Sequence, residues 1–294
     1  MPSPGSQVLR DLRRARRRRA YGDMDWMDAL YRVYVTAILS AIAVSLASGW
    51  IGGRPVTPAE LATAVHRGPP LVGLIVALAV AAGLRSGGRG GPLALEPADV
   101  QHVLLAPIPR RVALRGPAVR QLRFGAFVGL VAGMAAGNLA AQRLPGAYPA
   151  WVAWGGAAGL VTGLAWTGSA LVASGVRIGR RWAGVLGAAV LAWSAADIAR
   201  GTATSPATFL GRLSMSAARS VPSSPIGAVL LALPVAGMLG VGGTALEAAR
   251  RQAGLVSQLR FAVTMQDVRT VVLLRRQLAA EGPRRRPWAR LPAA

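Results

Sequence analysis

The chain has 294 residues, of which 53% are hydrophobic, and a formal net charge of +23 from 34 basic and 11 acidic residues. All basic residues are Arg, and the absence of Lys and Cys excludes a Walker A lysine, a Schiff-base lysine, thiol catalysis, disulfides and thiolate metal sites. Such a charge can indicate nucleic-acid binding, but no stacking aromatic residues interleave with the Arg residues, so we expect no nucleic-acid partner.

Six apolar segments follow one another along the chain, and each is long enough, or nearly so, to cross a hydrocarbon core of about 30 Å as a helix. They predict an all-α, polytopic helical membrane protein with about six transmembrane helices. Residues 33–246 would form the transmembrane domain, residues 1–32 a basic tail with an amphipathic lead-in helix, and residues 247–294 a C-terminal helix and basic tail. The six expected spans are residues 33–50, 69–84, 124–141, 150–176, 182–198 and 226–246.

The Arg residues are distributed unevenly between the connections of these spans. The two tails, the loop at residues 85–123 and the turn between the fourth and fifth spans hold 28 Arg, whereas the three other connections hold 6. The positive-inside rule then predicts that both termini are cytoplasmic. These side chains would also face anionic headgroups, so membrane lipid is an expected partner. The excess of Ala, Gly and Arg is typical of a GC-rich bacterial genome, which favours a bacterial plasma membrane.

The segment before the first span differs from a cleavable secretion signal. Asp23, Asp25 and Asp28 separate the Arg run at residues 13–19 from an apolar stretch longer than a typical signal core, so we interpret this span as an anchor. Residues 1–20 form either part of an amphipathic helix or a disordered basic tail.

The loop at residues 85–123 carries the clearest pattern outside the spans. Pro97 suits the first turn of a helix, and Glu96 and Asp99 place negative charge at its positive end. A second short helix is expected at residues 112–123. A short amphipathic helix beyond the membrane surface is typical of a docking element, and the alternative is a helix lying on lipid or on the rest of the chain. The expected partner-binding residues are Glu96, Pro97, Asp99, Val100, Val103, Leu104, Arg110 and Arg111.

The third and fourth spans contain glycines at four-residue intervals. This spacing keeps them on one helix face, where missing side chains let two backbones approach closely. We expect the two glycine faces to meet in a helical hairpin, although some of the spacings could arise by chance among 36 glycines. The helix-packing residues are Gly125, Gly129, Gly133 and Gly137 in the third span, and Gly155, Gly159 and Gly163 in the fourth.

The spans contain no Asp, Glu, His or Arg near mid-membrane, and Asp197 lies at the outer end of the fifth span. Carriers that couple transport to ions usually bury such groups, so an ion-coupled transporter is disfavoured. His66 and His102 are isolated, and no HExxH or GxSxG motif occurs, so we expect no catalytic site, metal site or cofactor in this chain. Pro234 predicts a kink in the sixth span.

Several short motifs carry a resemblance to a known family. They are Leu-Glu-Pro-Ala-Asp-Val at residues 95–100, Leu-Leu-Ala-Pro at residues 104–107 and the pair Arg110-Arg111. The loop containing them resembles that of ABC exporter membrane subunits of the type-two permease class. The tail at residues 258–278 also resembles actinobacterial members of this class.

The resemblance implies a permease subunit whose loop is a coupling helix seated on a separate ABC ATPase subunit, which would bind ATP and Mg²⁺. Members of the class are expected to continue with a second membrane half, whereas this chain ends at Ala294. We therefore expect a homodimer, or a chain that is one half of a longer protein. The alternative function is a non-transport scaffold or regulator that docks a cytoplasmic partner through the same loop. An integral membrane transferase is disfavoured because acidic and metal-binding clusters are lacking.

Overall fold

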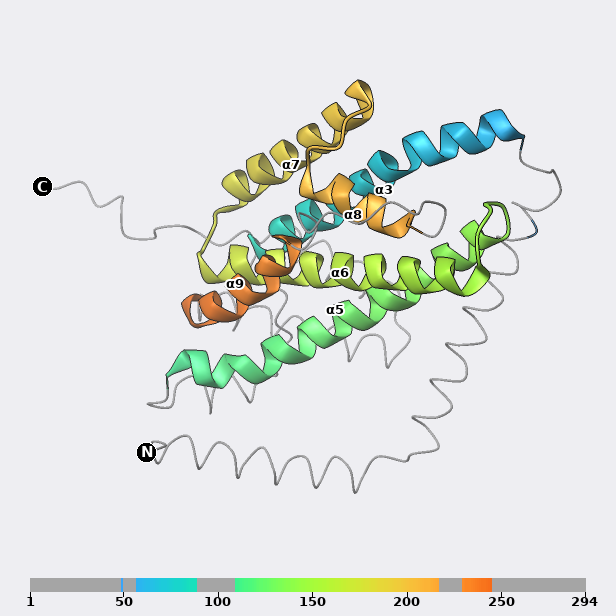
Figure 1. Cartoon of the computed structure of the whole chain (residues 1–294). Helices are drawn as coiled ribbons and strands as arrows, with labels where there is room; N and C mark the ends of the chain where they lie inside the picture. Colours follow the sequence, from blue (N-terminus) through green and yellow to red (C-terminus); the bar gives the residue numbers. More distant parts are fainter. Residues whose placement is uncertain (1–48, 50–56, 89–108, 217–228, 245–294) are drawn as a thin grey trace, which may run out of the picture.

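The computed structural model describes residues 49, 57–88, 109–216 and 229–244, and every regular element within these ranges is a helix (Figure 1). The all-helical class predicted from the sequence is confirmed for this part of the molecule. Its elements are α3 (Pro58–Gly87), α5 (Arg110–Ala141), α6 (Tyr148–Gly175), α7 (Arg180–Arg200), α8 (Pro206–Ser214), α9 (Ala232–Gly240) and the 3-10 helix η2 (Val241–Gly243).

Four of these helices, α3, α5, α6 and α7, are long and apolar enough to cross a membrane, by length and composition. They overlap the second to fifth predicted spans, and the described part is compatible with a multi-pass membrane protein. The predicted sixth span contains the shorter apolar helix Val229–Gly243. The predicted first span, residues 33–50, lies outside the described residues apart from Gly49, so the total of six stays a prediction.

Helix α3 begins at Pro58, well before the predicted start of the second span at residue 69. A capping box sets this start: Thr57 Oγ1 accepts a hydrogen bond from Glu60 N at 3.3 Å, and Thr57 N donates to Glu60 Oε2 at 2.8 Å. The pair satisfies N–H groups that the first helical turn leaves without intrahelical partners. The helix continues through the buried Pro69 and Pro70 to Gly87.

Helix α5 runs without interruption over 32 residues, through Pro117. Residues 112–123 are helical, as predicted, but they form the first part of α5 and not a short helix of their own. No turn signal separates Arg123 from Phe124 in the sequence, so the hydrogen-bond ladder continues from the first part into the second. Residues 85–87 and 110–123 of the predicted loop belong to α3 and α5, and residues 88–109 connect the two helices.

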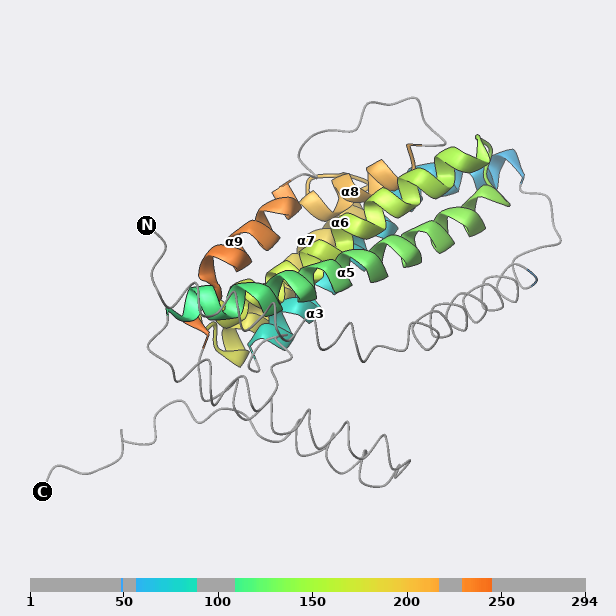
Figure 2. The same cartoon turned by 90° about the horizontal axis from the view of Figure 1, so that it is seen from below.

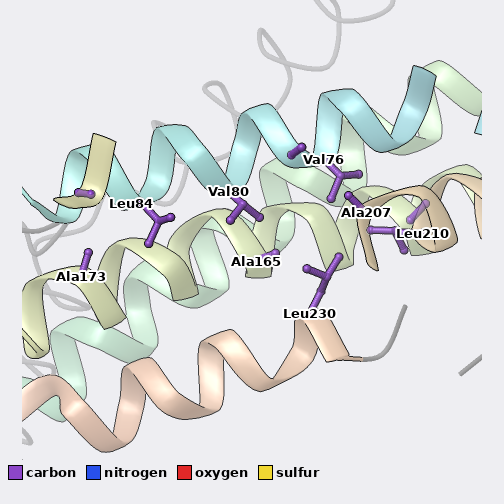
Figure 3. Close-up of a cluster of buried hydrophobic side chains, with 11 residues drawn as sticks. Val76, Val80, Leu84, Ala165, Ala173, Ala207, Leu210 and Leu230 are labelled. Atoms are coloured by element: carbon purple, nitrogen blue, oxygen red, sulfur yellow. The ribbon is translucent and has the colours of Figure 1, made fainter. Parts of the chain in front are cut away.

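Helix α6 lies at the centre, with α5, α3 and α9 packed against it, while α7 and α8 pack against α3 (Figures 1 and 2). Buried apolar side chains from α3, α6, α7 and α8 meet in one core, joined by Leu230 from the chain before α9 (Figure 3). Many of its members are alanines, so the helices approach closely. The core consists of Val76, Ala77, Val80, Leu84, Ala158, Ala165, Ala173, Ala183, Ala207, Leu210 and Leu230.

Pro234 lies in the first turn of α9, which begins at Ala232. A proline in this position costs no intrahelical hydrogen bond, because the first N–H groups of a helix have no partner there. A 3-10 turn at residues 229–231 runs directly into α9, and the expected kink at Pro234 stays a prediction.

Candidate functional site

Most of the predicted partner-binding residues fall outside the described ranges. These are Glu96, Pro97, Asp99, Val100, Val103 and Leu104. The docking role of this segment therefore stays a prediction. Arg110 and Arg111 are described: they are the first two residues of α5, both are exposed, and Pro109 before them provides no side-chain cap.

The ends of the connection that holds the predicted coupling helix lie at one end of the bundle. Gly88, after α3, approaches α7, since a Cβ built on it would lie 3.0 Å from Ala183 Cβ. At the start of α5, Arg111 Cβ would lie 3.2 Å from a Cβ built on Gly242. Arg177, in the turn between α6 and α7, donates from Nε to Gly243 O at 2.8 Å. The end of α3 and the starts of α5 and α7 thus share this end with η2.

We call this end, with the Arg residues around it, the basic end. All nine of its described Arg side chains are exposed: Arg85, Arg110, Arg111, Arg115, Arg120, Arg123, Arg177, Arg180 and Arg181. The two carboxylates of the described residues, Glu60 and Asp197, belong to the start of α3 and the end of α7, away from the basic end. The described carboxylates therefore lie at the opposite end of the bundle, which also holds Arg67, Arg143, Arg200 and Arg212. The side of the membrane that this end faces stays a prediction.

The seven glycines predicted to pack lie opposite one another between α5 and α6. A Cβ built on Gly129 would meet Gly159 O, and a Cβ built on Gly133 would meet Gly155 O. Towards the basic end, a Cβ on Gly125 would meet Thr167 Cγ2 and Gly163 O, and towards the other end one on Gly137 would meet Trp151 O. Backbone carbonyls thus occupy the space of the missing side chains, so the two helices could not approach this closely with larger residues.

Glycine contacts also occur on two further sides of α6, which the sequence reasoning missed. On the α3 side, a Cβ on Gly83 would meet Trp166 O, and one on Gly87 would meet Ala170 O. On the α9 side, a Cβ built on Gly168 would lie 2.5 Å from Pro234 N, and a Cβ built on Gly175 would meet Gly240 O. The only available signal was the abundance of small residues in α6, which does not identify their partners.

A buried polar cluster around Asp197 is a second feature that sequence reasoning missed. In the connection after the fifth predicted span, α8 packs against α3, with Ala207, Thr208, Leu210 and Gly211 buried. A Cβ on Gly73, midway along α3, would lie 2.7 Å from Thr208 Cα. Gly201, by contrast, lies beside His66, two turns nearer the start of α3. The chain therefore enters between the helices after Gly201 and returns outward as α8.

The carboxylate of Asp197 holds this entering segment in place. Its Oδ1 accepts from Thr204 Oγ1 at 2.7 Å, and its Oδ2 accepts from Ser205 N at 2.9 Å and from Thr208 Oγ1 at 2.8 Å. Thr204 N and Thr202 Oγ1 also donate to it. Asp197 is 1% exposed, so water cannot solvate its carboxylate. Hydroxyl and amide donors and the N-terminus of α8 stabilise its charge instead. Ser205 and Pro206, a capping residue followed by proline, were the sequence signal for this helix start.

The side chains described above, within residues 57–88, 109–216 and 229–244, act by packing and hydrogen bonding. These residues contain no group of three or more His, Cys, Asp or Glu side chains that could hold a metal ion. His66 is exposed on α3. The buried Ser194 Oγ, one turn before Asp197 on α7, has no hydrogen-bond partner in the structure.

No protein-family model, curated protein or solved structure matches this chain.

Proposed function

We propose that this chain is the transmembrane permease subunit of an ATP-driven ABC exporter in a bacterial plasma membrane. It would have about six transmembrane helices and cytoplasmic termini, and a separate subunit would bind ATP and Mg²⁺ and hydrolyse ATP. The residues that carry the proposal are the motifs at residues 95–100 and 104–107 and the pair Arg110-Arg111, which resemble the coupling loop of this class.

One structural observation supports the proposal: the helices on either side of the coupling loop both pack tightly on the central helix α6. Helix α3 has 30 residues and α5 has 32, which is about 45 Å and about 48 Å at 1.5 Å per residue. Their glycines meet α6 backbone carbonyls at Gly83 and Gly87 and along the α5 hairpin. Displacement of the loop by a partner would thus be transmitted through two long helices to the centre of the bundle.

The charge at the start of α5 suits the same role. Arg110 and Arg111 are exposed and directly follow the loop. An acidic rim around a groove on the ATPase would attract this pair, which would orient the encounter, while apolar contacts from the loop helix would supply most of the affinity.

A membrane scaffold or regulator that docks a partner through this loop is the second candidate. Four helices of membrane length are compatible with it as well. The two functions differ in one measurable respect, since only a permease subunit should change the rate of ATP hydrolysis by the partner.

The test is copurification of an ATPase with the full-length tagged chain from the native membrane, followed by measurement of ATP hydrolysis. Val103→Asp would place a charge on the apolar face of the predicted loop helix. Burying this unpaired charge in a desolvated contact should weaken the binding free energy by on the order of several kcal/mol, which should abolish copurification. In the predicted helix, at about 100° per residue, His102 would lie away from the apolar face formed by Val100, Val103 and Leu104, so His102→Asp is a control that should retain the partner.

Normal ATPase binding by Val103→Asp would refute the coupling-helix assignment. Copurification of a partner that lacks ATPase activity, lost in Val103→Asp and kept in His102→Asp, would favour the scaffold.

A further inference from the structure

The basic end has properties that the proposed function does not use. Its nine described Arg side chains are all exposed, and both described carboxylates lie elsewhere. Helices α5 and α7 each begin with an Arg pair, Arg110-Arg111 and Arg180-Arg181, and neither helix has a side-chain cap at its start. Cations at a helix N-terminus add to the positive end of the peptide dipole, which is unfavourable unless an anion lies nearby.

Two of these Arg residues contact η2 directly. Arg111 lies beside Gly242, and Gly243, the next residue, accepts the hydrogen bond from Arg177. Arg177 has a left-handed backbone, with φ of 57°, in the turn that leads directly into Arg180 and Arg181. Arg111 and Arg177 therefore meet at η2, and Arg180 and Arg181 follow Arg177 by three and four residues in the chain.

Exposed apolar side chains alternate with these Arg residues. Val112 is 40% exposed, Val176 67% and Trp182 65%. Each directly follows or precedes an Arg: Val112 follows Arg111, Val176 precedes Arg177 and Trp182 follows Arg181. A soluble anion would gain nothing from such neighbours, whereas a lipid supplies a phosphate for the Arg side chains and acyl carbons for the apolar ones. Trp is also favoured at the level of the headgroups.

We infer that the basic end binds the headgroups of acidic phospholipids, with Arg111, Arg180 and Arg181 contacting phosphates and Val176 and Trp182 contacting the start of the acyl chains. This inference does not depend on the ABC exporter assignment. Arg177 has a different role, because its hydrogen bond to Gly243 positions η2 against the turn.

The test uses the full-length protein in a neutral detergent, titrated with dioctanoyl phosphatidylglycerol and, separately, with dioctanoyl phosphatidylcholine. Dissociation constants are measured by native mass spectrometry. We expect phosphatidylglycerol to bind at least tenfold more tightly. The triple variant R111Q/R180Q/R181Q should lose at least tenfold in affinity for phosphatidylglycerol, which corresponds to about 1.4 kcal/mol.

The control variant R67Q/R200Q/R212Q removes the same charge from exposed Arg residues at the opposite end. It should change the affinity less than twofold. Arg177 is left unchanged in both variants, and equal melting temperatures in detergent would show that both fold.

Four results would overturn the inference, the last being unchanged lipid affinity in R111Q/R180Q/R181Q. The first is equal affinity for the two lipids, and the second is an equal loss in both triple variants. The third is binding of glycerol phosphate as tightly as phosphatidylglycerol, which would indicate a site for a soluble anion. If lipid affinity is unchanged in R111Q/R180Q/R181Q but ATPase copurification is lost, the surface binds a protein.

Discussion

The close contact between α5 and α6 can be tested by adding one methyl group. A Cβ at position 159 would meet Gly129 O and would lie 2.7 Å from Gly133 Cα and 2.9 Å from Gly133 N. Ordinary carbon contacts lie at about 3.5–4.0 Å, so Gly159→Ala requires the two backbones to separate by about 1 Å. The neighbours are main-chain atoms, which cannot rotate away.

The expected magnitude follows from two opposing effects. Overpacking of this kind costs about 1–3 kcal/mol, and the loss of dispersion along the hairpin is part of that cost. Replacing a helical Gly by Ala favours the helix by about 1 kcal/mol. Gly159→Ala should therefore destabilise the protein by up to about 2 kcal/mol, and Gly159→Leu should destabilise it more.

Gly184 on α7 provides a matched control, because a Cβ built there meets nothing within 4 Å. Gly184→Ala should change only the helix propensity, so it should be neutral or stabilise the protein by up to about 1 kcal/mol. The assay is thermal unfolding of the full-length protein in detergent, followed by circular dichroism. If Gly159→Ala raises the melting temperature as much as Gly184→Ala does, the proposed contact is refuted.

Two further predictions concern the Asp197 cluster and the topology. Asp197→Asn should destabilise the protein by about 2–4 kcal/mol, because an amide cannot accept from every donor around it. Thr202→Val removes only the longer hydrogen bond to Asp197 and should cost less than about 1 kcal/mol. Equal melting temperatures for the two variants would exclude a central role for the carboxylate. The chain lacks native Cys, so single cysteines can report sidedness. In intact cells an impermeant maleimide should label exposed Ala147→Cys and not Ser86→Cys at the basic end, and the reverse pattern would overturn the predicted orientation.

Features that depend on local composition could be predicted well. The apolar stretches of α3, α5, α6 and α7 were recognisable from the sequence, although the ends of the helices were not. Helix α3 starts earlier than predicted because of the capping box at Thr57, and α5 starts earlier because it continues through Pro117. The register of the hairpin glycines also follows from a local period, since residues four apart share a helix face. The coupling-helix residues between Glu96 and Leu104 remain predictions that stand on the sequence alone.

The sequence by itself determined the helical class, the membrane-length apolar helices and the grouping of Arg residues in particular connections, because each is a property of residues near one another in the chain. Only the tertiary structure decided which side of α6 faces α3, α5 or α9, and that α8 enters between the helices beside Asp197. These outcomes depend on contacts between distant residues, such as Gly73 with Thr208 and Gly168 with Pro234. A glycine or a threonine has the same local preferences whichever helix lies opposite, so its partner is selected by the fit of whole helices and not by any pattern within one of them.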